Sequence, residues 1–234
     1  ACLVWSSPLP GNARRPMRYV NLMGENKPHL LVKTINNLGA ETRVQYVPST
    51  KFYVEDRMNG RPWITKIPFP VHVVERVETY DYISRNRFVT GYAYHHGYFD
   101  GVEREFRGFG MVEQRDTEEF TTLSKSEAFP NAPNIDSASH VPPVLTKTWF
   151  HTGAYIEGER ISRQCEHEYY GAPNETDLNF DQKWNEFESA LLPDTVLPPG
   201  LTLDEEREAC RTLKGSMLRQ EVYALDGTPK AEHP

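Results

Sequence analysis

The stretch YDYISRNRFVTGYAYHHGYFDGVEREFRGFG, residues 80–110, decides the fold of this chain. It continues a β-prone run that begins at residue 71 and passes through the loop SRN into a second run over residues 87–96. Tyr, Phe, Val and Thr dominate both runs, and these residue types favour strands. Short polar loops between two such runs are typical of antiparallel hairpins. The stretch therefore predicts a sheet built from successive hairpins.

A third strand is predicted after the dipeptide Asp100-Gly101, which is a strong signal for a tight turn. The returning segment, residues 102–116, alternates in character at its start. Its uncharged or mixed positions are Val102, Arg104, Phe106 and Gly108, and its uniformly charged positions are Glu103, Glu105 and Arg107. A period of two places alternate residues on opposite faces of a strand. We therefore expect a sheet with one solvated, charged face.

The same pattern extends toward the N-terminus, where β-rich runs over residues 29–35 and 40–47 flank Asn36, Asn37, Leu38 and Gly39. Asn and Gly tolerate the positive φ that a hairpin turn requires. The fold class predicted is mainly β, with antiparallel hairpins and short inserted helices.

The inserted helices are expected over residues 180–192 and 203–214. Phe180, Trp184, Phe187 and Leu191 recur at helical intervals, and Pro193 stops that helix. In the second helix, Thr202 and Glu205 have the spacing of a capping box, and Gly215 follows its end. The segment SMLRQEVYALDG then predicts a return to strand and turn, at Asp226-Gly227.

Composition excludes several classes of function. The 234 residues carry a net charge of −7, with a pI near 5.7, so no general attraction to nucleic acid is expected. No apolar run approaches the roughly 20 residues that a membrane-spanning helix needs, so direct membrane insertion is not expected. The cysteines Cys2, Cys165 and Cys210 are far apart and predict neither a disulfide framework nor a structural zinc site.

The Pro-rich stretch 128–143 is the best internal boundary, and it divides the chain into segments 1–130 and 131–234. Both ends of the chain lack a signal, a cap or a charged tail. We therefore expect the chain to be a segment of something larger.

The sequence offers no motif typical of a catalytic, cofactor or metal site. His95 and His96 are adjacent, and adjacent strand residues point to opposite faces, so they do not form one metal site in regular β geometry. The sequence has no GxSxG, HExxH or phosphate-binding glycine motif. We therefore predict no catalytic, cofactor-binding or metal-binding residue, and no enzyme activity.

One alternative function stays open at this point. The aromatic and acidic residues of 92–107 are also consistent with a free-standing β-domain that hydrolyses or binds carbohydrate. Glu103 and Glu105 share one strand face and approach the separation of a glycosidase pair, and Tyr98 or Trp149 would be the sugar platforms. Ion pairing of the two glutamates with neighbouring strands is the ordinary explanation of the same pattern.

Long motifs of the chain resemble a known family. The phrases PFPVHVVERVETYDYISRNRFVTGYAYHHGYFDGVEREFRGFGMVEQRDTE and PPVLTKTWFHTGAY are similar to the middle region of the B component of bacterial insecticidal toxin complexes (Tc toxins), which are related to Rhs/YD-repeat proteins. ACLVWSSPLPG, LGAETRVQYVPSTKFY and the segment from LPDTVLP to YALDG match in the same order, so the resemblance covers essentially the whole chain.

The resemblance also gives a meaning to a recurring set of residues. YD repeats are short hairpins that carry Arg, Tyr, Asp and Gly. Two degenerate copies are present, the first at Arg87, Tyr92, Tyr94, Asp100 and Gly101, and the second at Arg219, Tyr223, Asp226 and Gly227. The resemblance implies that these residues have a structural role in a shell wall.

What the resemblance implies for function is delivery. The B component, together with a C component, forms a hollow β-shell that encloses a cytotoxic domain, and a propeller in B docks onto the pore-forming A component. By this resemblance, residues 1–130 comprise the end of a propeller-adjacent region and a first shell segment, and residues 131–234 comprise a second shell segment. The protein would be made in the bacterial cytoplasm and secreted, with the C and A components as partners.

Overall fold

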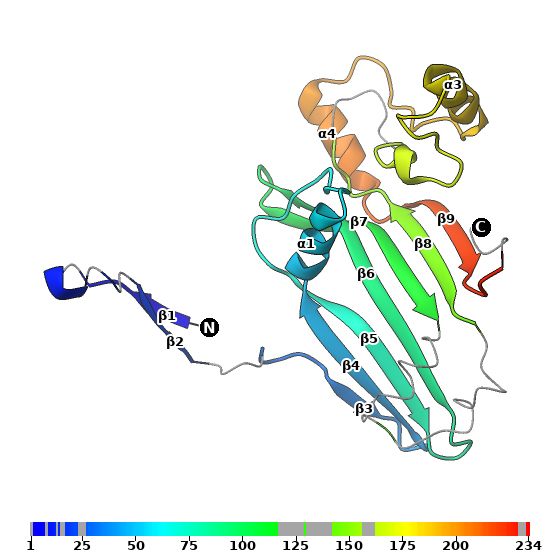
Figure 1. The fold of residues 1–234 in the computed structure, drawn as a ribbon. Coiled ribbons are helices and arrows are strands. Elements are labelled where there is room, and N and C mark those ends of the chain that lie inside the picture. Colours follow the sequence, from blue (N-terminus) through cyan, green and yellow to red (C-terminus); the bar gives the residue numbers. More distant parts are fainter. Residues whose placement is uncertain are drawn as a thin grey trace.

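The computed structural model describes residues 2–7, 9–12, 14, 17–22, 27–116, 129, 142–155, 162–228 and 233–234. Within them, a two-stranded sheet of β1 (Cys2–Trp5) and β2 (Arg18–Asn21) stands apart from the rest in Figure 1. A short 3-10 turn, Pro10–Asn12, lies between these two strands. Both strands are exposed along their length.

The main body is a seven-stranded antiparallel sheet in which every strand pairs with its neighbour in sequence. Its strands are β3 (Lys33–Ile35), β4 (Ala40–Pro48), β5 (His72–Asp81), β6 (Arg87–Asp100), β7 (Glu105–Asp116), β8 (Val144–Phe150) and β9 (Met217–Ala224). The edge strands are β3 and β9, each of which pairs with one other strand in the described part of the chain. The predicted mainly β fold of antiparallel hairpins is confirmed.

The first two predicted hairpins form as expected, with small shifts in their ends. In the β3–β4 turn, Asn37 and Gly39 have φ angles of 58° and 100°, the positive values that Asn and Gly accommodate. The side chain of Asn36 accepts hydrogen bonds from the backbone N–H groups of Leu38 and Ala40. The residues that break the two β-prone runs therefore also build the turn.

The third hairpin differs from the prediction in two ways. Its turn is not a tight one at Asp100-Gly101, because residues 101–104 form a longer turn with Arg104 at a φ of 54°. The pairing also shifts by one residue between Tyr98–Gly108 and Phe99–Phe106, which makes Arg107 the extra residue of a β-bulge. The bulge ends the regular alternation that the sequence pattern assumed.

Helix α1 (Thr50–Met58) was not predicted from the sequence, and it contains the β-favouring residues Phe52, Tyr53 and Val54. It directly follows β4 and packs against β6. Its residue Phe52 is 5% exposed and forms a core with Trp63 and Val73. Tertiary packing therefore decides the conformation of this segment against its weak intrinsic preference.

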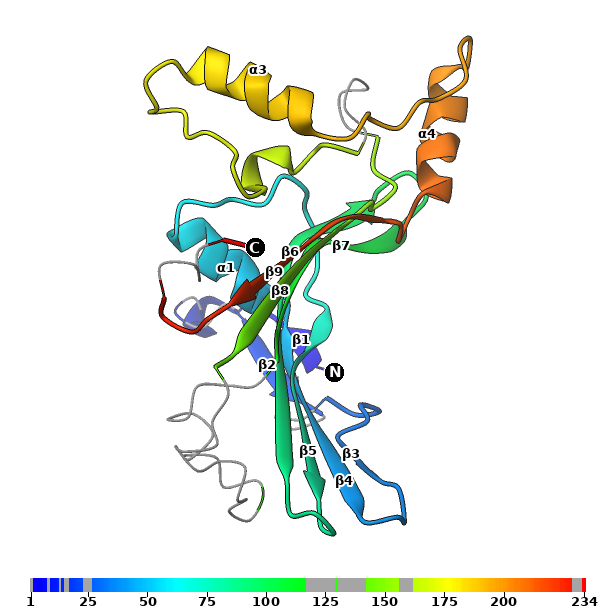
Figure 2. The same ribbon diagram turned by 90° about the vertical axis from the view of Figure 1, so that its right-hand side faces the viewer.

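The two predicted helices are confirmed as α3 (Phe180–Ala190) and α4 (Leu203–Thr212), within the long connection between β8 and β9. The capping box of α4 is present, since Thr202 accepts from the N–H of Glu205 and the Glu205 side chain accepts from the N–H of Thr202. Figure 2 shows the sheet edge-on, with α1 against one face and with α3 and α4 beyond one end. A 3-10 turn, η3 (Glu166–Glu168), lies in the same connection.

A second core lies where this connection meets the sheet. Trp149 of β8 is fully buried and packs edge-on against Tyr169 with a ring-centroid distance of 5.0 Å. Met111 and Cys165 complete the buried part of this cluster. The predicted boundary after residue 130 falls between β7 and β8, which are paired strands of one sheet, and most of the stretch 128–143 lies outside the described residues.

Candidate functional site

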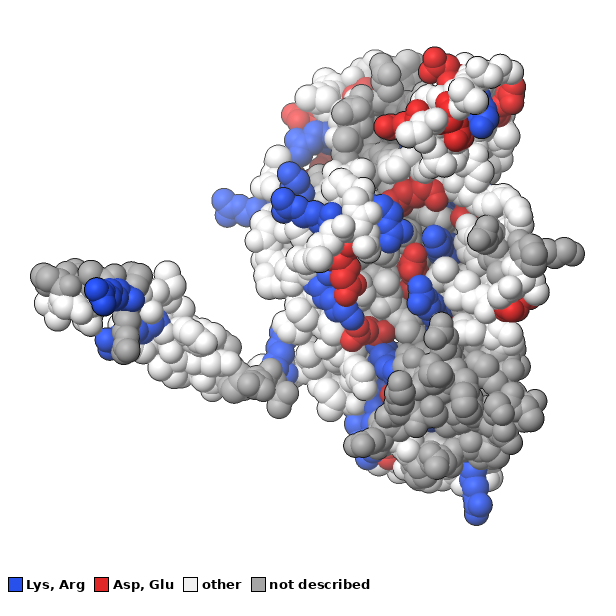
Figure 3. Space-filling view, viewed as in Figure 1, with Lys and Arg blue, Asp and Glu red and all other residues white. Residues whose placement is uncertain are grey.

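One face of the seven-stranded sheet carries charged residues on every strand. The pairing register places on this face Lys33, Glu41, Arg43, Arg76, Glu78, Arg87, Glu113, Arg115, Lys147, Arg219 and Glu221. Opposite-charge side chains alternate across the strands, as the red and blue atoms in the middle of Figure 3 show. We call this the charged face.

The opposite face carries few charges over the same strands, namely Asp81 and Asp116 near the strand ends. The register places on it Thr34, Thr42, Val44, Val77, Thr79, Thr90, Val112, Thr146, Thr148 and Val222. These side chains are half-buried or exposed, whereas Glu41, Glu78 and Glu221 of the charged face are 6%, 1% and 3% exposed. Much of the charged face is therefore covered rather than solvated, because Phe129 stacks on Tyr80 and Arg43, and the β8–β9 connection reaches Glu221 through Tyr170.

Arg87, the first residue of the predicted YD-like motif, is an element of this face. Its guanidinium donates to Glu78 at 2.6 Å, and both side chains are 1% exposed. Arg76 binds the other carboxylate oxygen of Glu78 at 2.8 Å. A buried carboxylate held by two arginines ties β5 to β6, and a charge at such depth is tolerated because it is paired.

The second copy of the motif is arranged in the same manner around Glu221. Arg219 donates to Glu221 at 2.5 Å, and the hydroxyl of Tyr223 donates to its other oxygen at 2.5 Å. The backbone N–H of Tyr170 donates to Glu221 as well. Burial and this hydrogen bond to Glu221 raise the pKa of Tyr223 above its ordinary value.

The Asp-Gly pairs of the two copies behave differently. Asp226 accepts from the N–H of Thr228, and Gly227 has a φ of 73°, so this pair makes a local turn. Asp100 is 4% exposed, caps the N–H groups of Val102 and Glu103, and pairs with Arg107 at 2.7 Å. Gly101 does not adopt a positive φ.

Arg107 is drawn inward by the bulge and holds the end of the hairpin. It is 5% exposed and donates to the carbonyl oxygen of Gly153 at 2.7 Å as well as to Asp100. Burial acts to raise the pKa of Asp100, but hydrogen bonds from Glu103 and Val102 and the charge of Arg107 outweigh it and lower the pKa. The predicted placement of Arg107 on a wet face is therefore wrong.

Tyr92 and Tyr94 take separate positions. Tyr94 packs against Phe52 of α1 and against Phe109, with ring-centroid distances of 5.8 and 5.0 Å. Burial raises the pKa of Tyr94 to about 12. Tyr92 lines the cavity described below.

The acidic residues of the carbohydrate hypothesis are engaged by helix α4. Lys214 donates to Glu105 at 2.8 Å, and Arg211 lies 3.6 Å from Glu105 and 3.8 Å from Glu103. Trp149 is 0% exposed, so it offers no platform for a sugar. The ion pairs run to a helix rather than to a neighbouring strand, and they account for both glutamates without a hydrolytic role.

His96, Cys165 and Glu168 form a cluster whose ligand atoms lie within 4.8 Å of one another, a combination that could hold a metal ion. Here the hydrogen bonds favour a closed hydrogen-bonded cluster. His96 Nδ1 accepts from the N–H of Ile64, so the ring carries its proton on Nε2 and donates it to Glu168 at 2.8 Å. Trp149 donates to the other oxygen of Glu168. Burial raises the pKa of the Cys165 thiol, which keeps it protonated.

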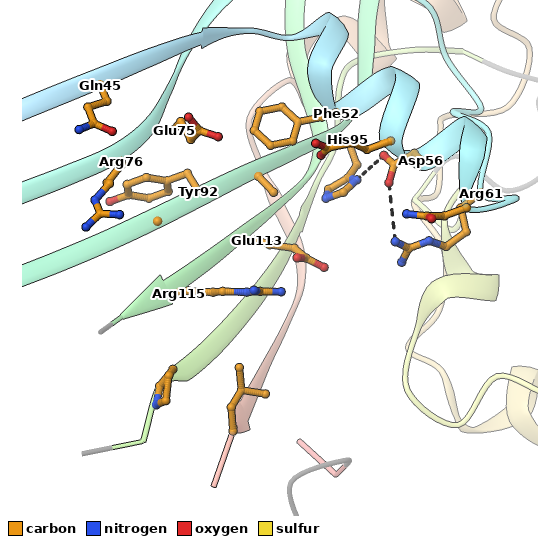
Figure 4. Close-up of a pocket in the computed structure, with 16 residues that line it drawn as sticks. Gln45, Phe52, Asp56, Arg61, Glu75, Arg76, Tyr92, His95, Glu113 and Arg115 are labelled. Atoms are coloured by element: carbon orange, nitrogen blue, oxygen red, sulfur yellow. Dashed lines mark hydrogen bonds and ion pairs between the residues drawn. The ribbon is translucent and has the colours of Figure 1, made fainter. Parts of the chain in front are cut away.

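A cavity of about 700 Å³ is hollowed into the charged face between α1 and strands β4–β7. Figure 4 shows Glu113 and Arg115 at this cavity, and His95 and Asp56 near helix α1. The Nδ1 atom of His95 lies 2.5 Å from Asp56, whose carboxylate also accepts from the indole N–H of Trp63 at 2.7 Å. We call this cavity the groove.

Three buried acceptors were not predicted from the sequence, namely Asp56, Glu78 and Glu221. The alternation in VERVE over residues 74–78 is a signal for Glu78, since it places Arg76 and Glu78 on one face. Asp56 carries no such signal, because it belongs to a helix that the sequence did not reveal.

Comparison with known proteins identifies the family. Residues 2–153 match the model of the insecticide toxin TcdB middle/N-terminal region, which is more than half of the chain. The chain belongs to this family, and the resemblance to the middle region of the Tc toxin B component is confirmed.

Solved structures give a consistent result. The crystal structure of TcdB2-TccC3-TEV is 30% identical over 88% of this chain, with a TM-score of 0.62. The structure of the Photorhabdus luminescens Tc holotoxin pore, with the TccC3-D651A mutation, is 28% identical over 98% of this chain, with a TM-score of 0.67. This chain corresponds to 9% and 10% of those chains, respectively.

A search of curated proteins gives no match. Within the described residues, no helix has both the length and the apolar character needed to cross a membrane.

Proposed function

We propose that this chain is a non-catalytic structural segment of a toxin-complex B component. In this proposal it forms part of a hollow shell that encloses a cytotoxic domain, and the assembled protein delivers that domain through an A-component pore. The observation that carries the proposal is the family match over residues 2–153, together with similarity to TcdB2-TccC3 over most of the chain. Its partners would be a C component and an A component, and its location would be outside the bacterium.

The architecture supports a wall. Among the described residues, β3 and β9 are the edge strands of a seven-stranded meander. Such a sheet extends by adding strands at either side, since an open edge presents free backbone donors and acceptors. The buried Arg87–Glu78 ion pair joins β6 to β5, and the Arg219–Glu221 pair lies along β9 with Glu221 buried. We propose this bracing as the structural role of the YD-like residues.

The division of the chain is part of the same proposal. Residues 1–130 would comprise the end of a propeller-adjacent region and a first shell segment, and residues 131–234 a second shell segment. The separate β1–β2 sheet supports a change of architecture near the N-terminal end.

Protection of a cargo from protease tests the function. The full-length protein that carries this chain is co-expressed with its C-type partner, and the complex is treated with a nonspecific protease. We expect the enclosed domain to be cleaved far more slowly than the same domain alone. Glu221→Gln, which removes a buried brace, should increase cleavage, whereas Glu186→Gln on the exposed side of α3 should not. Equal cleavage of the domain with and without the B-type protein would contradict the proposal.

A further inference from the structure

A second, much smaller cavity lies where the segment between α1 and β5 meets the end of β8. Its volume is about 10 Å³, which is about the smallest space that holds one water molecule. Ile64 and Thr65 line it from the segment 59–71, and His151 and Thr152 line it from the residues that follow β8. Cys165 of the β8–β9 connection belongs to the same lining. We call it the small cavity.

His151 brings a buried hydrogen-bond donor to the small cavity. The residue is 4% exposed, and its Nδ1 atom accepts from the N–H of Gly153 at 2.8 Å. Burial lowers the pKa of His151, so the ring is neutral at pH 7 and carries a single proton. That proton is therefore on Nε2, and this N–H has no hydrogen-bond partner in the described part of the chain.

Thr65 brings a second buried polar group to the same lining. It is 6% exposed, and its Oγ1 atom likewise has no hydrogen-bond partner among the described residues, His151 included. Native proteins bond nearly all such groups either to protein or to ordered water. A donor and a hydroxyl that both lack a protein partner therefore line one cavity, and its occupant has to satisfy both.

The chemistry of the lining selects the occupant. A metal ion does not fit, because the lone pair that would bind it on His151 Nε2 carries the proton. His96, the other histidine of the lining, already donates from Nε2 to Glu168 at 2.8 Å. Burial raises the pKa of the Cys165 thiol, so it offers no thiolate. An organic ligand needs a cavity many times larger. A water molecule fits, since it accepts and donates at once.

The residues beside Thr65 show what such a water would join. The N–H of Ile64 donates to Nδ1 of His96 at 3.2 Å, and the carbonyl oxygen of Lys66 accepts from the N–H of Phe99 at 3.2 Å. Both partners belong to β6. The segment 59–71 is thus bonded to the sheet on either side of Thr65, and the side chain of Thr65 is left for a link toward β8.

We propose that the small cavity binds one structural water molecule. The water oxygen accepts a hydrogen bond from Nε2 of His151, and one of the water O–H groups donates to Oγ1 of Thr65. The water ties the segment 59–71 to the end of β8 and so holds together two connections at one end of the sheet. This inference does not depend on the proposed shell function.

A cryo-EM map of the full-length protein that carries this chain tests the water directly, at a resolution that shows ordered water molecules. We expect density for one water roughly 2.7–3.2 Å from both His151 Nε2 and Thr65 Oγ1. The proposal is overturned by a map that shows waters at other buried polar groups but none here. It is also overturned by a direct hydrogen bond between Thr65 and His151.

Hydrogen exchange measured by mass spectrometry on the same protein tests the link. Thr65→Val keeps the size of the side chain but removes the hydroxyl, so exchange in peptides covering residues 59–71 should accelerate about fivefold or more. Thr65→Ser keeps the hydroxyl and should accelerate exchange less than Thr65→Val does. Thr34→Val is the matched control, because it makes the same change at an exposed position of β3.

The variants also give results that would overturn the link. Exchange over residues 59–71 that is no faster in Thr65→Val than in Thr34→Val would do so, and so would a larger effect of Thr65→Ser than of Thr65→Val. If Thr65→Val does not fold, the map of the wild-type protein still decides whether the water is bound.

Discussion

Replacing Glu78 with Gln should weaken the sheet at its most deeply buried charge. Glu78 is 1% exposed and holds Arg87 at 2.6 Å and Arg76 at 2.8 Å. The substitution keeps the shape but removes the negative charge that faces the guanidinium of Arg87, itself 1% exposed. Breaking a buried ion pair in this way costs about 3–5 kcal/mol.

Hydrogen exchange measured by mass spectrometry on the full-length protein localises the effect. Since about 1.4 kcal/mol corresponds to a factor of ten, exchange in peptides covering residues 72–100 should accelerate by roughly 100-fold to 5,000-fold, up to the limit set by global unfolding. Glu55→Gln is the control, because Glu55 is 53% exposed and lies 4.0 Å from Lys51, a pair worth at most about 0.5 kcal/mol. An acceleration below about threefold for Glu78→Gln would refute the reasoning.

Three further predictions concern the end of the sheet near α4 and η3. Burial acts to raise the pKa of Glu168, but the hydrogen bond from His96 outweighs it and lowers the pKa to about 2. The stability that Glu168 contributes is therefore complete above pH about 4.5 and is lost as the pH falls toward 2. Glu168→Gln should flatten an acid-unfolding curve in that window, and an unchanged curve would count against the cluster. Gly153→Ala should lower the melting temperature more than Gly215→Ala. Both glycines have positive φ, but a Cβ at Gly153 meets backbone and side-chain atoms at 3.1–3.3 Å, while a Cβ at Gly215 meets open space. Equal shifts of the melting temperature in calorimetry would contradict this. Glu105→Gln should loosen α4 slightly and reduce the salt dependence of its hydrogen exchange, since the ion pairs that Glu105 makes are partly exposed. An unaltered salt dependence would show that packing alone holds the helix.

Local patterns were enough to predict the hairpins and the late helices. Asn37 and Gly39 provide a turn conformation that few other residues adopt, and Thr202 and Glu205 cap a helix through contacts only three residues apart. Such features depend on near neighbours in the sequence, so they can be recognised without knowledge of the rest of the fold.

The missed features depend on distant contacts. Helix α1 exists because Phe52 enters a core with Trp63 and Val73, and Asp56 meets His95 from a position 39 residues away. The bulge at Arg107 follows from the pairing of β6 with β7 and from the carbonyl of Gly153 that receives the guanidinium. The alternation of residue types along a strand predicts neither helix α1 nor the bulge at Arg107.

The burial of charge was the least predictable property. An alternation of charged and uncharged residues typically indicates a solvated face and a buried face, but here buried residues lie on the charged face. Pairing explains the inversion, since Glu78 and Glu221 each bind cationic side chains within 2.8 Å. The groove could not be found from the sequence, because its walls come from α1 and four strands.

The central proposal is that this chain is one segment of a much larger shell-forming protein. The most direct test is the intact mass of the native protein that carries this sequence, measured together with any chain that co-purifies with it. We predict a mass several times the 26.9 kDa of these 234 residues, with a second large chain bound. A native product of 26.9 kDa that purifies alone would contradict the proposal.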